Sequence, residues 1–575
     1  MRRTNALLAI LLLTACTAES GAPPAATPMG SAEPAAAGAY DLILSGGKIV
    51  DGTGAAWFYG DLGIRADRIA AITPAGVLAG ATAGTRIDAT GMVVSPGFID
   101  IQSHSRGAFL TGDGRVLGKI TQGITTEIMG EGWTNAPENE RTRAAADAID
   151  PEAAAAGLDF SGEHGFDAWL RAMESHGTSP NVGSFVGAST IRIYGKGMDA
   201  GPANAEELEQ MKTAVRHAME DGAFGVASAL IYPPGNYAST DELVEIVSAS
   251  APYGGVYITH MRSEADRYLE AIDEAMEIGK RAGVPVEIYH LKAAGRRNFS
   301  KGPQAVAKID SARAAGLDVQ ANMYPYIAGG TGLAALLPPW ASEGGRLLEN
   351  LQDPATRKRI HDEVIGDNVE WENLGALATP GGVLVVEAPG AEQHVGKRLS
   401  EVAAELGGDW VDAAIELTIA TKGQAGMVVF MMSEPNLALQ MKQPWIKFGT
   451  DAGGMDPDSV TSMAHPRSYG TFPRILGRYV RDARVFPLED AIRKMSSAVA
   501  TRLSLGDRGV LREGMMADIV VFDPETVLDV ATFEQPHQLS VGIRDVFVNG
   551  VAVVRDGEHT GAKPGRVVRG PGWRP

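Results

Sequence analysis

Five residues with the chemistry of metal ligands lie at the ends of short apolar runs in the sequence. They are three of the eleven histidines, His104, His260 and His290, and two acids, Glu131 and Asp451. A lone histidine usually serves packing, but three imidazoles together with two carboxylates offer the donor set that zinc prefers, with iron, manganese or cobalt as alternatives. The pattern predicts a metal site that activates water for hydrolysis.

The runs that carry these residues predict buried parallel strands, which are continuously apolar and alternate with helices. Helical stretches such as 203–222 separate them. Eight alternations predict an α/β fold with a (β/α)8 barrel in residues 96–501, whose site residues gather at the C-terminal strand ends. The span of about 326–445 is too long for one crossover and predicts an inserted lid or subdomain. The runs are FIDIQSH (98–104), TTEIMGE (125–131), NVGSFVG (181–187), FGVASALIY (224–232), GVYITHM (255–261), VPVEIYHLK (284–292), LDVQANMYP (317–325) and IKFGTDAG (446–453).

Both ends of the chain predict a different kind of structure. Residues 39–95 and 502–575 alternate short β-like runs with turns rich in Gly, Asp and Asn. Two such segments on either side of a long α/β stretch predict one small β-sandwich domain built from both chain ends. A length of 575 residues with 45% hydrophobic content suits a globular protein with a large core.

The first 38 residues predict export and lipid attachment. Residues 1–16 combine a basic start, the apolar run ALLAILLL and the sequence Leu-Thr-Ala-Cys, which resembles a bacterial lipobox. Cys16, the single cysteine of the chain, is the expected lipidation site, with an ordinary secretory signal as the alternative. Residues 17–38 are rich in Ala, Pro, Gly and Ser and predict a flexible tether. The expected location is the bacterial cell envelope, as a periplasmic or outer-membrane lipoprotein.

The net charge of the chain restricts the classes of molecule that it is expected to bind. The formal net charge of −19 argues against nucleic acid, which requires a basic surface. A small molecule is the expected partner, with a membrane contacted only through the N-terminal lipid. The sequence predicts no particular oligomeric state.

Several motifs resemble those of a known family. They are SPGFID (95–100), THMRSE (259–264), YHLKAAG (289–295), GTDAGG (449–454), HPRSYGTFPRILGRYVR (465–481) and a tail at 522–550. With the strand-end set and the β segments at both ends, they resemble the amidohydrolase superfamily and, more narrowly, the N-acyl-D-amino-acid deacylases. The similarity runs from residue 40 to about residue 570.

The resemblance implies a ligand set. A tight site in this family uses one ligand after the second strand together with histidines that match His260 and His290. The second-strand ligand is a cysteine in well-known members, whereas the matching turn here carries Glu131, and the run 224–232 has no lysine that could serve instead. The second position would keep His104 and Asp451, because Gln102 replaces the first histidine of an H-x-H pair. The prediction is one tight Zn2+, or another divalent metal, with a second site weak or absent.

The resemblance also implies the reaction. Asp451 would accept a proton from water and pass it to the leaving amine. Lys292, on the strand of His290, together with Tyr324 and Arg467 would bind the carboxylate of an N-acyl amino acid. Tyr232 is a candidate oxyanion donor, with packing as the alternative role. Arg262 is expected to pair with Glu264, and His465 to be structural.

Other functions stay open from the sequence. The favoured enzyme is an N-acyl-D-amino-acid deacylase acting on linear amides. Hydrolysis of cyclic amides or of dipeptides containing D-residues is the alternative within the superfamily. A surface lipoprotein that binds a ligand without catalysis is the alternative from another class, and the altered H-x-H pair at Gln102 is the feature that favours it.

Overall fold

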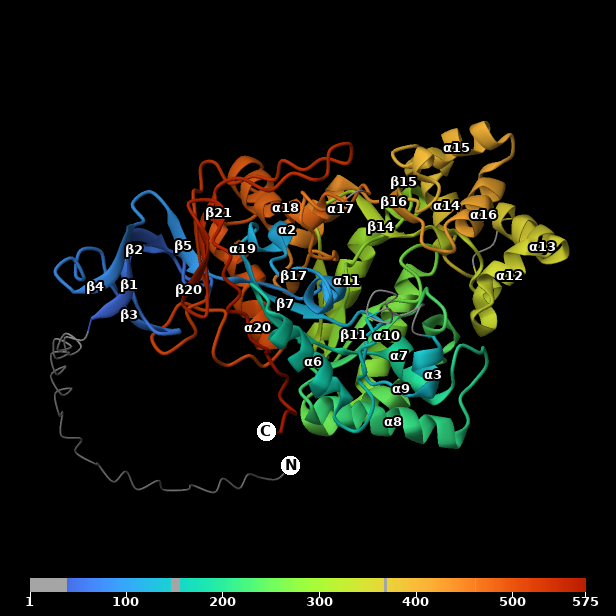
Figure 1. Ribbon diagram of the computed structural model, residues 1–575, viewed down its shortest axis with the longest axis horizontal. Coiled ribbons are helices and arrows are strands. Elements are labelled where there is room, and N and C mark those ends of the chain that lie inside the picture. The colour runs from blue at the N-terminus through green and yellow to red at the C-terminus, as the bar shows by residue number, and fades with distance from the viewer. Residues whose placement is uncertain (1–38, 146–155, 367–369, 461, 575) are drawn as a thin grey trace, which may run out of the picture.

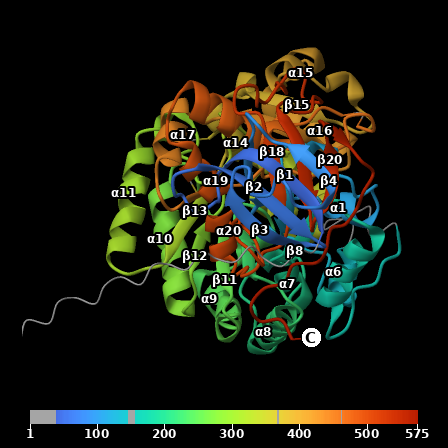
Figure 2. The same ribbon diagram turned by 90° about the vertical axis from the view of Figure 1, so that its left-hand side faces the viewer.

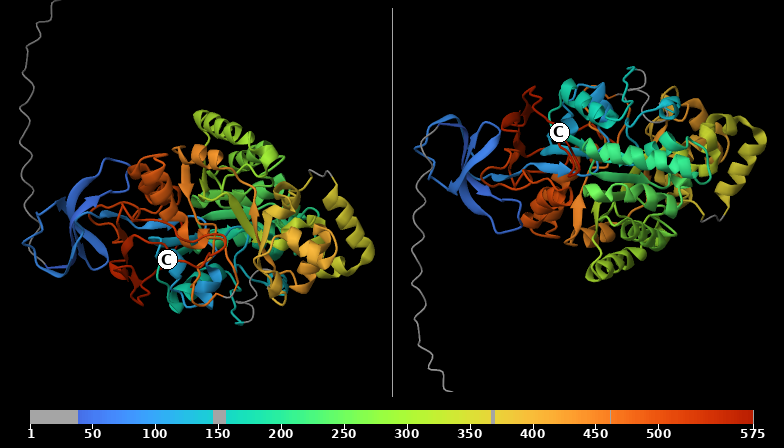
Figure 3. Two further views of the ribbon diagram at one scale, coloured as in Figure 1. Left: turned by 90° about the horizontal axis from the view of Figure 1, so that it is seen from above. Right: turned by 90° about the horizontal axis from the view of Figure 1, so that it is seen from below.

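The structure is a computed structural model that describes residues 39–145, 156–366, 370–460 and 462–574. Three parts follow one another along an elongated molecule: a β-rich end, a middle part of strands covered by helices, and a distal part of helices with a small sheet (Figure 1). The views from above and below show the same order (Figure 3). The predicted signal segment with Cys16 and the tether lie outside the described residues.

The two ends of the chain meet in one nine-stranded sheet at the β-rich end (Figure 2). β18 joins them by pairing antiparallel with β5, Ile519 lying opposite Pro96. After this sheet the C-terminal segment lies against the middle part. There the carbonyl of Arg566 and the amide of Val568 hydrogen-bond to the backbone of Val182. The strands are β1 (Tyr40–Ile49), β2 (Phe58–Arg65), β3 (Arg68–Pro74), β4 (Ala83–Asp88), β5 (Val93–Pro96), β18 (Ile519–Phe522), β19 (Ile543–Val548), β20 (Val551–Arg555) and β21 (Glu558–His559).

Parallel strands run through the middle part. They form two sheets, β6-β7-β8 and β9-β10-β11-β12-β13-β17. Only Phe185 separates β8 from β9, and a parallel bridge between Ser103 and Ala452 links the segments that follow β6 and β17. Each of the eight predicted runs contains at least one strand. The strands are β6 (Phe98–Asp100), β7 (Ile124–Met129), β8 (Asn181–Ser184), β9 (Val186–Gly187), β10 (Gly225–Ala229), β11 (Val256–His260), β12 (Val286–Ile288), β13 (Val319–Met323) and β17 (Ile446–Phe448).

Amphipathic helices connect these strands. α8 spans Ala205–Glu220, close to the predicted 203–222. Asn204 caps it by accepting the amide hydrogens of the first turn, while Glu207 accepts the amide of Asn204 in return. Its buried residues recur every three or four positions and face the core. Further helices of this part are α6 (Gly165–His176), α7 (Ala188–Gly195), α9 (Thr240–Ser248), α10 (Tyr268–Ala282), α11 (Lys301–Ala314), α18 (Arg467–Arg474), α19 (Leu488–Met495) and α20 (Ser497–Arg502).

The predicted insertion forms the distal part (Figure 1). Besides helices it contains a three-stranded antiparallel sheet, β14-β16-β15, which was not predicted from the sequence. This part buries an apolar cluster of its own that includes Leu333, Val385 and Leu417. Its elements are β14 (Ala328–Gly332), α12 (Leu347–Gln352), α13 (Pro354–Ile365), α14 (Leu374–Ala378), β15 (Val383–Glu387), α15 (Leu399–Leu406), α16 (Trp410–Ala420) and β16 (Gly426–Phe430), and α17 (Glu434–Met441) leads back to β17.

Candidate metal centre and active site

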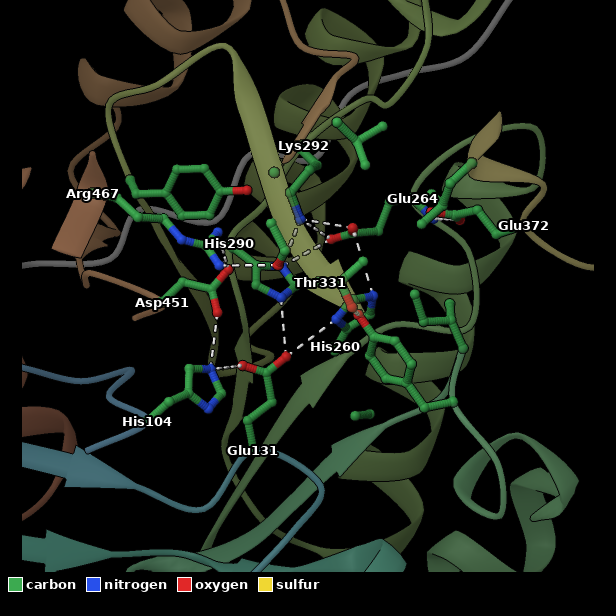
Figure 4. A pocket seen from close by; sticks show the side chains of 18 of the residues that line it. His104, Glu131, His260, Glu264, His290, Lys292, Thr331, Glu372, Asp451 and Arg467 are labelled. Atoms are coloured by element: carbon green, nitrogen blue, oxygen red, sulfur yellow. Dashed lines mark hydrogen bonds and ion pairs between the residues drawn. The ribbon is translucent and has the colours of Figure 1, made fainter. Parts of the chain in front are cut away.

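Three of the predicted ligands converge at the strand ends (Figure 4). His260 is the last residue of β11, and His290 follows β12 by two residues. His260 Nδ1 and His290 Nε2 each lie 3.1 Å from the same oxygen, Oε1 of Glu131. None of the three residues is more than 9% exposed, so their donor atoms meet in the interior.

The turn that carries Glu131 requires glycine on both sides. Gly130 and Gly132 have φ angles of +116° and +68°, which residues with a Cβ atom rarely adopt. A Cβ atom on Gly130 would lie 2.4 Å from the carbonyl oxygen of Phe185. The tight turn after β7 therefore aims the carboxylate of Glu131 at the two histidines.

A second group shares Glu131. Asp451, three residues beyond β17, places Oδ1 3.0 Å from His104 Nε2 and 3.0 Å from Gln102 Nε2. Gln102 Nε2 also donates to Glu131 Oε2 at 2.6 Å. Burial opposes the charge on His104, but hydrogen bonds to Asp451 and Glu131 raise its pKa to about 9. The predicted residues of the second position thus lie together, with an amide nitrogen between the two acids.

Two site residues have a backbone conformation that L-residues rarely adopt. The φ angles of His290 and Asp451 are +33° and +52°. Side-chain and backbone bonds hold them there: the amide of His290 donates to Asn322 Oδ1 at 2.8 Å, and that of Asp451 to the carbonyl of Gln102 at 2.8 Å. Such strain marks positions where the side chain must point in one direction.

A cation faces the second group from the start of α18. Nη1 of Arg467 lies 2.6 Å from Asp451 Oδ2, and its guanidinium stacks 4.8 Å above the ring of Tyr324. Nε of Arg467 is buried and has no hydrogen-bond partner among the described residues. His465 accepts the amide hydrogen of Arg467 and hydrogen-bonds the Ala328 carbonyl, which fixes this helix start. Arg467 therefore keeps a donor available for a ligand.

A buried acid, Glu264, lies behind His290. Its carboxylate receives Lys292 Nζ at 2.6 Å and lies 2.9 Å from His290 Nδ1. Burial would raise the pKa of Glu264, but Lys292 and the two histidines hold it well below its usual range. The expected pair between Arg262 and Glu264 was wrong. Arg262 donates to Glu274 of α10 and to the carbonyl oxygens of Asn236 and Ala238, which hold its guanidinium there, whereas Lys292 pairs with Glu264.

The distal part adds an acid that the sequence analysis missed. Glu372, just before α14, accepts the backbone N–H of Glu264 at 2.5 Å. Its other oxygen is buried without a hydrogen-bond partner among the described residues. Burial and the charge of Glu264 raise the pKa of Glu372 to about 8. Glu264 had a sequence signal, four residues after His260 in THMRSE, whereas Glu372 had none.

One cavity of about 320 Å³ collects the candidate residues. Tyr232 lies on its wall and shares a hydrogen bond of 2.8 Å with Thr331. Apolar side chains, among them Trp133, Leu374 and Met431, line other parts of the wall, together with Glu264 and Glu372. The predicted residues on the wall are His104, Glu131, Tyr232, His260, His290, Lys292, Tyr324, Asp451 and Arg467. The strand-end residues and Arg467, from the start of α18, thus lie around one cavity.

The first group fits a zinc ion. The ligand atoms of Glu131, His260 and His290 all lie within 4.8 Å of one another. Two imidazoles and one carboxylate match zinc, and they leave room for a water molecule. Glu264 and Lys292 both contact Nδ1 of His290, so the other ring nitrogen, Nε2, faces Glu131. The second group, His104, Glu131 and Asp451, meets the same distance criterion.

Comparison with known proteins places this site in a family. Residues 85–554 match the amidohydrolase family. The chain belongs to this family. Among curated amidohydrolases it is 36% identical to a D-aminoacylase of Alcaligenes xylosoxydans xylosoxydans, over 92% of this chain and 97% of the relative. An N-acyl-D-glutamate deacylase of the same organism is 34% identical over 92% and 96%.

Solved structures of amidohydrolases have the same mixed α/β fold. A D-aminoacylase studied for one-metal activation and second-metal attenuation of its binuclear metal centre has a TM-score of 0.77 and 34% identity, covering 92% of this chain and 100% of that one. The N-acyl-D-glutamate deacylase of Bordetella bronchiseptica, solved with zinc and a phosphonate inhibitor, has a TM-score of 0.76 and 31% identity over the same shares. A dihydropyrimidinase at 15% identity shares the fold alone.

Proposed function

We propose that this amidohydrolase removes the acyl group from N-acyl-D-amino acids in a metal-dependent reaction. The observation that carries the proposal is the cluster of Glu131, His260 and His290 with Asp451 beside it in one cavity. Relatives above 30% identity named for N-acyl-D-amino acids support the substrate class. These relatives do not favour the alternatives, which were hydrolysis of cyclic amides, hydrolysis of dipeptides containing D-residues, and ligand binding without catalysis.

The proposed cofactor is one Zn2+ held by Glu131, His260 and His290, with other divalent metals as alternatives and a weak or absent second site at His104 and Asp451. A zinc ion bound there would supply a Lewis acid that polarises a carbonyl group and makes water more acidic. Glu264 fixes the orientation of His290, the task that carboxylates commonly perform behind metal-binding histidines.

Asp451 performs the proton transfers in this proposal. Its Oδ1 faces Gln102 and His104, and its Oδ2 faces Arg467, so the carboxylate is fixed on both sides. Burial opposes the charge of Asp451, but Arg467 lowers its pKa, which keeps it ionised as a base near neutral pH. Asp451 takes a proton from the attacking water and delivers it to the nitrogen of the leaving amine.

Arg467 and Tyr324 form the proposed site for the substrate carboxylate. Arg467 lines the cavity, and its buried Nε has no partner among the described residues. Its Nη1 already donates to Asp451 and its Nη2 to the carbonyl of Gly330, so the Nε–H group is the donor proposed for the carboxylate. Lys292 acts at the same wall through its charge, although Glu264 already holds its ammonium group. Tyr232 remains the proposed oxyanion donor, since its hydroxyl lies on the cavity wall beside Thr331.

The proposal extends to the finer architecture. The two parallel sheets would close as a (β/α)8 barrel of residues 96–501, which the continuous β8–β9 segment and the Ser103–Ala452 bridge support. The sheet of both chain ends would form a small β-sandwich domain of residues 39–95 and 502–575, apart from the terminal segment that returns to Val182. The span of about 326–445 would act as a lid over the cavity, to which it contributes Glu372, Leu374 and Met431.

Location in the cell envelope is also a proposal. It depends on Cys16 as the lipidation site and on residues 17–38 as a tether, both outside the described residues. Within the described residues, no helix is long and apolar enough to cross a membrane. Metabolic labelling with a fatty acid, in the wild type and in Cys16→Ser, tests the anchor, and equal labelling of both would contradict it.

The test of the proposed function is a substrate panel. Matched N-acetyl-D- and N-acetyl-L-amino acids are offered to the zinc-loaded protein lacking residues 1–38, with Asp451→Asn as the control. Release of acetate from the D series, lost in the variant, is the expected result. Absence of cleavage in both series while zinc remains bound would overturn the proposal.

A further inference from the structure

Gln102 lies between the two acids of the site. Its Nε2 is 2.6 Å from Glu131 Oε2 and 3.0 Å from Asp451 Oδ1, and the residue is 1% exposed. The two hydrogens of the amide nitrogen therefore serve two carboxylates at once. The reverse orientation would bring the amide oxygen against both acids, so the hydrogen-bond network determines which way the carboxamide faces.

The amide nitrogen contacts two carboxylate oxygens that a second ion at His104 would also use. His104 Nε2 lies 3.0 Å from Asp451 Oδ1 and 3.4 Å from Glu131 Oε2. These are the same carboxylate oxygens that Gln102 contacts. A cation bound by His104, Glu131 and Asp451 would have to displace both hydrogen bonds of the amide.

The backbone holds Gln102 in this position. Its amide donates to Asp100 Oδ1 at 3.1 Å, and its carbonyl accepts the amide of Asp451 at 2.8 Å. Asp100 is itself fixed by Lys119 at 2.8 Å, and both side chains are fully buried. The carboxamide is therefore aimed by a rigid buried network.

We propose that the carboxamide of Gln102 takes the place of a second metal ion: it links Glu131 to Asp451, positions Asp451 for proton transfer, and keeps the second position closed to zinc. This rests on the proposed function for the role of Asp451. It leaves Glu131 Oε1 to the first group with His260 and His290, while Glu131 Oε2 belongs to Gln102. Gln102 is thus a positioning residue, and the chain works with one metal.

A closed second position would separate this chain from one of its relatives. The D-aminoacylase compared above has a binuclear centre with one-metal activation and second-metal attenuation. With the second position closed by an amide, excess zinc should not attenuate this protein. Gln102→His replaces the amide donors by an imidazole and should open the position.

The decisive measurement counts metals without using activity. Wild-type protein equilibrated with excess zinc and freed of unbound ions should retain about one zinc per chain, and Gln102→His about two. The double variant Gln102→His, His104→Ala should return to about one, because it loses a ligand of the opened position. Two tightly bound zinc ions in the wild type would overturn the proposal, since the amide would then have rotated to coordinate through its oxygen.

Kinetics supply the second readout. Gln102→Met keeps about the size of the side chain but loses the donors, and Gln102→Ala loses both. Each should lower kcat about tenfold or more with KM changed less than about threefold, because positioning of Asp451 affects the reaction step. Unchanged kcat in both variants would overturn the positioning role. Failure of the wild type to hydrolyse any N-acyl-D-amino acid would contradict the proposed function instead, and the zinc count would still test Gln102.

Discussion

Two clusters of charged residues lie on the same strands of this protein and differ in kind. The mouth cluster, past the C-terminal strand ends, consists of Glu131, His260, His290, Asp451 and Arg467. The foot cluster consists of Glu287 in the middle of β12, Lys447 in the middle of β17, Asp318 just before β13 and Arg502 at the end of α20. Both are largely buried, and both border cavities, of about 320 Å³ at the mouth and 530 Å³ at the foot. Cavity size therefore does not identify the active site.

In the foot cluster, the positive charges are paired with negative ones. Lys447 Nζ lies 2.8 Å from Glu287 Oε2, with both side chains fully buried, and Arg502 pairs with Glu287 at 3.1 Å and with Asp318 at 3.0 Å. Each cation faces an acid. Burial lowers the pKa of Lys447 to about 8 despite the charge of Glu287.

The mouth cluster keeps groups that can bind a metal or a ligand. It contains the histidines, the strained backbone of His290 and Asp451, and the unpartnered Nε of Arg467. Loss of a foot charge should therefore reduce stability, and loss of a mouth charge should reduce activity. Four predictions test this contrast.

The largest expected effect is on the reaction. Asp451→Asn removes the proton acceptor but keeps the shape of the side chain, so kcat should fall about a thousandfold. The melting temperature should also fall, because Asn has a single oxygen and cannot accept hydrogen bonds from both Gln102 and Arg467. Steady-state kinetics and calorimetry on the same preparation check both parts. An activity within tenfold of wild type would remove Asp451 from the mechanism.

The next effect is on stability at the other end. Glu287→Gln leaves Lys447 and Arg502 without their shared buried charge and should cost about 3 to 5 kcal/mol of unfolding free energy. Denaturant titration measures this loss, while kcat at a temperature where the variant is folded should stay at the wild-type value. Glu277→Gln, on the exposed side of α10, is the control. A variant that keeps its stability but loses activity would reverse the comparison.

A smaller effect is expected behind the mouth cluster. Glu264→Gln weakens the orientation of His290 and the hold on Lys292, and zinc affinity should fall about 10- to 100-fold. Competition with a zinc chelator measures the affinity directly. Glu274→Gln, which removes the partner of Arg262 instead, should leave it unchanged. Equal losses in both variants would mean that general destabilisation is the cause.

The smallest effect concerns pH. The pKa of Glu372 is raised to about 8 in the fold from an ordinary value of 4.5, so the folded state holds a proton that the unfolded state releases. Its contribution to stability is full below pH 4.5 and is lost as pH rises towards 8. The stability of the wild type relative to Glu372→Gln should therefore fall as pH rises across this window. Denaturant titrations at several pH values measure it, and parallel curves would contradict the raised pKa.

Local sequence pattern determined much of this protein. Apolar runs placed all eight parallel segments, because a buried strand must be apolar along its whole length. The residues at the ends of those runs come together in the structure, since the C-terminal ends of parallel strands meet at one face. His260, His290, Glu131 and Asp451 were found in this way, and they line one cavity.

The tertiary structure alone decided the partners. Gln102 looked like a degraded ligand, and its contact with Glu131 and Asp451 depends on loops 29 and 349 residues apart. Glu372 reaches Glu264 across 108 residues from an insertion without strand or ligand signals. Arg262 pairs with Glu274 of α10, and Lys292 pairs with Glu264. Periodicity reports which side of an element is buried, but hydrogen bonds and ion pairs between distant segments depend on how the elements pack, which no local pattern encodes.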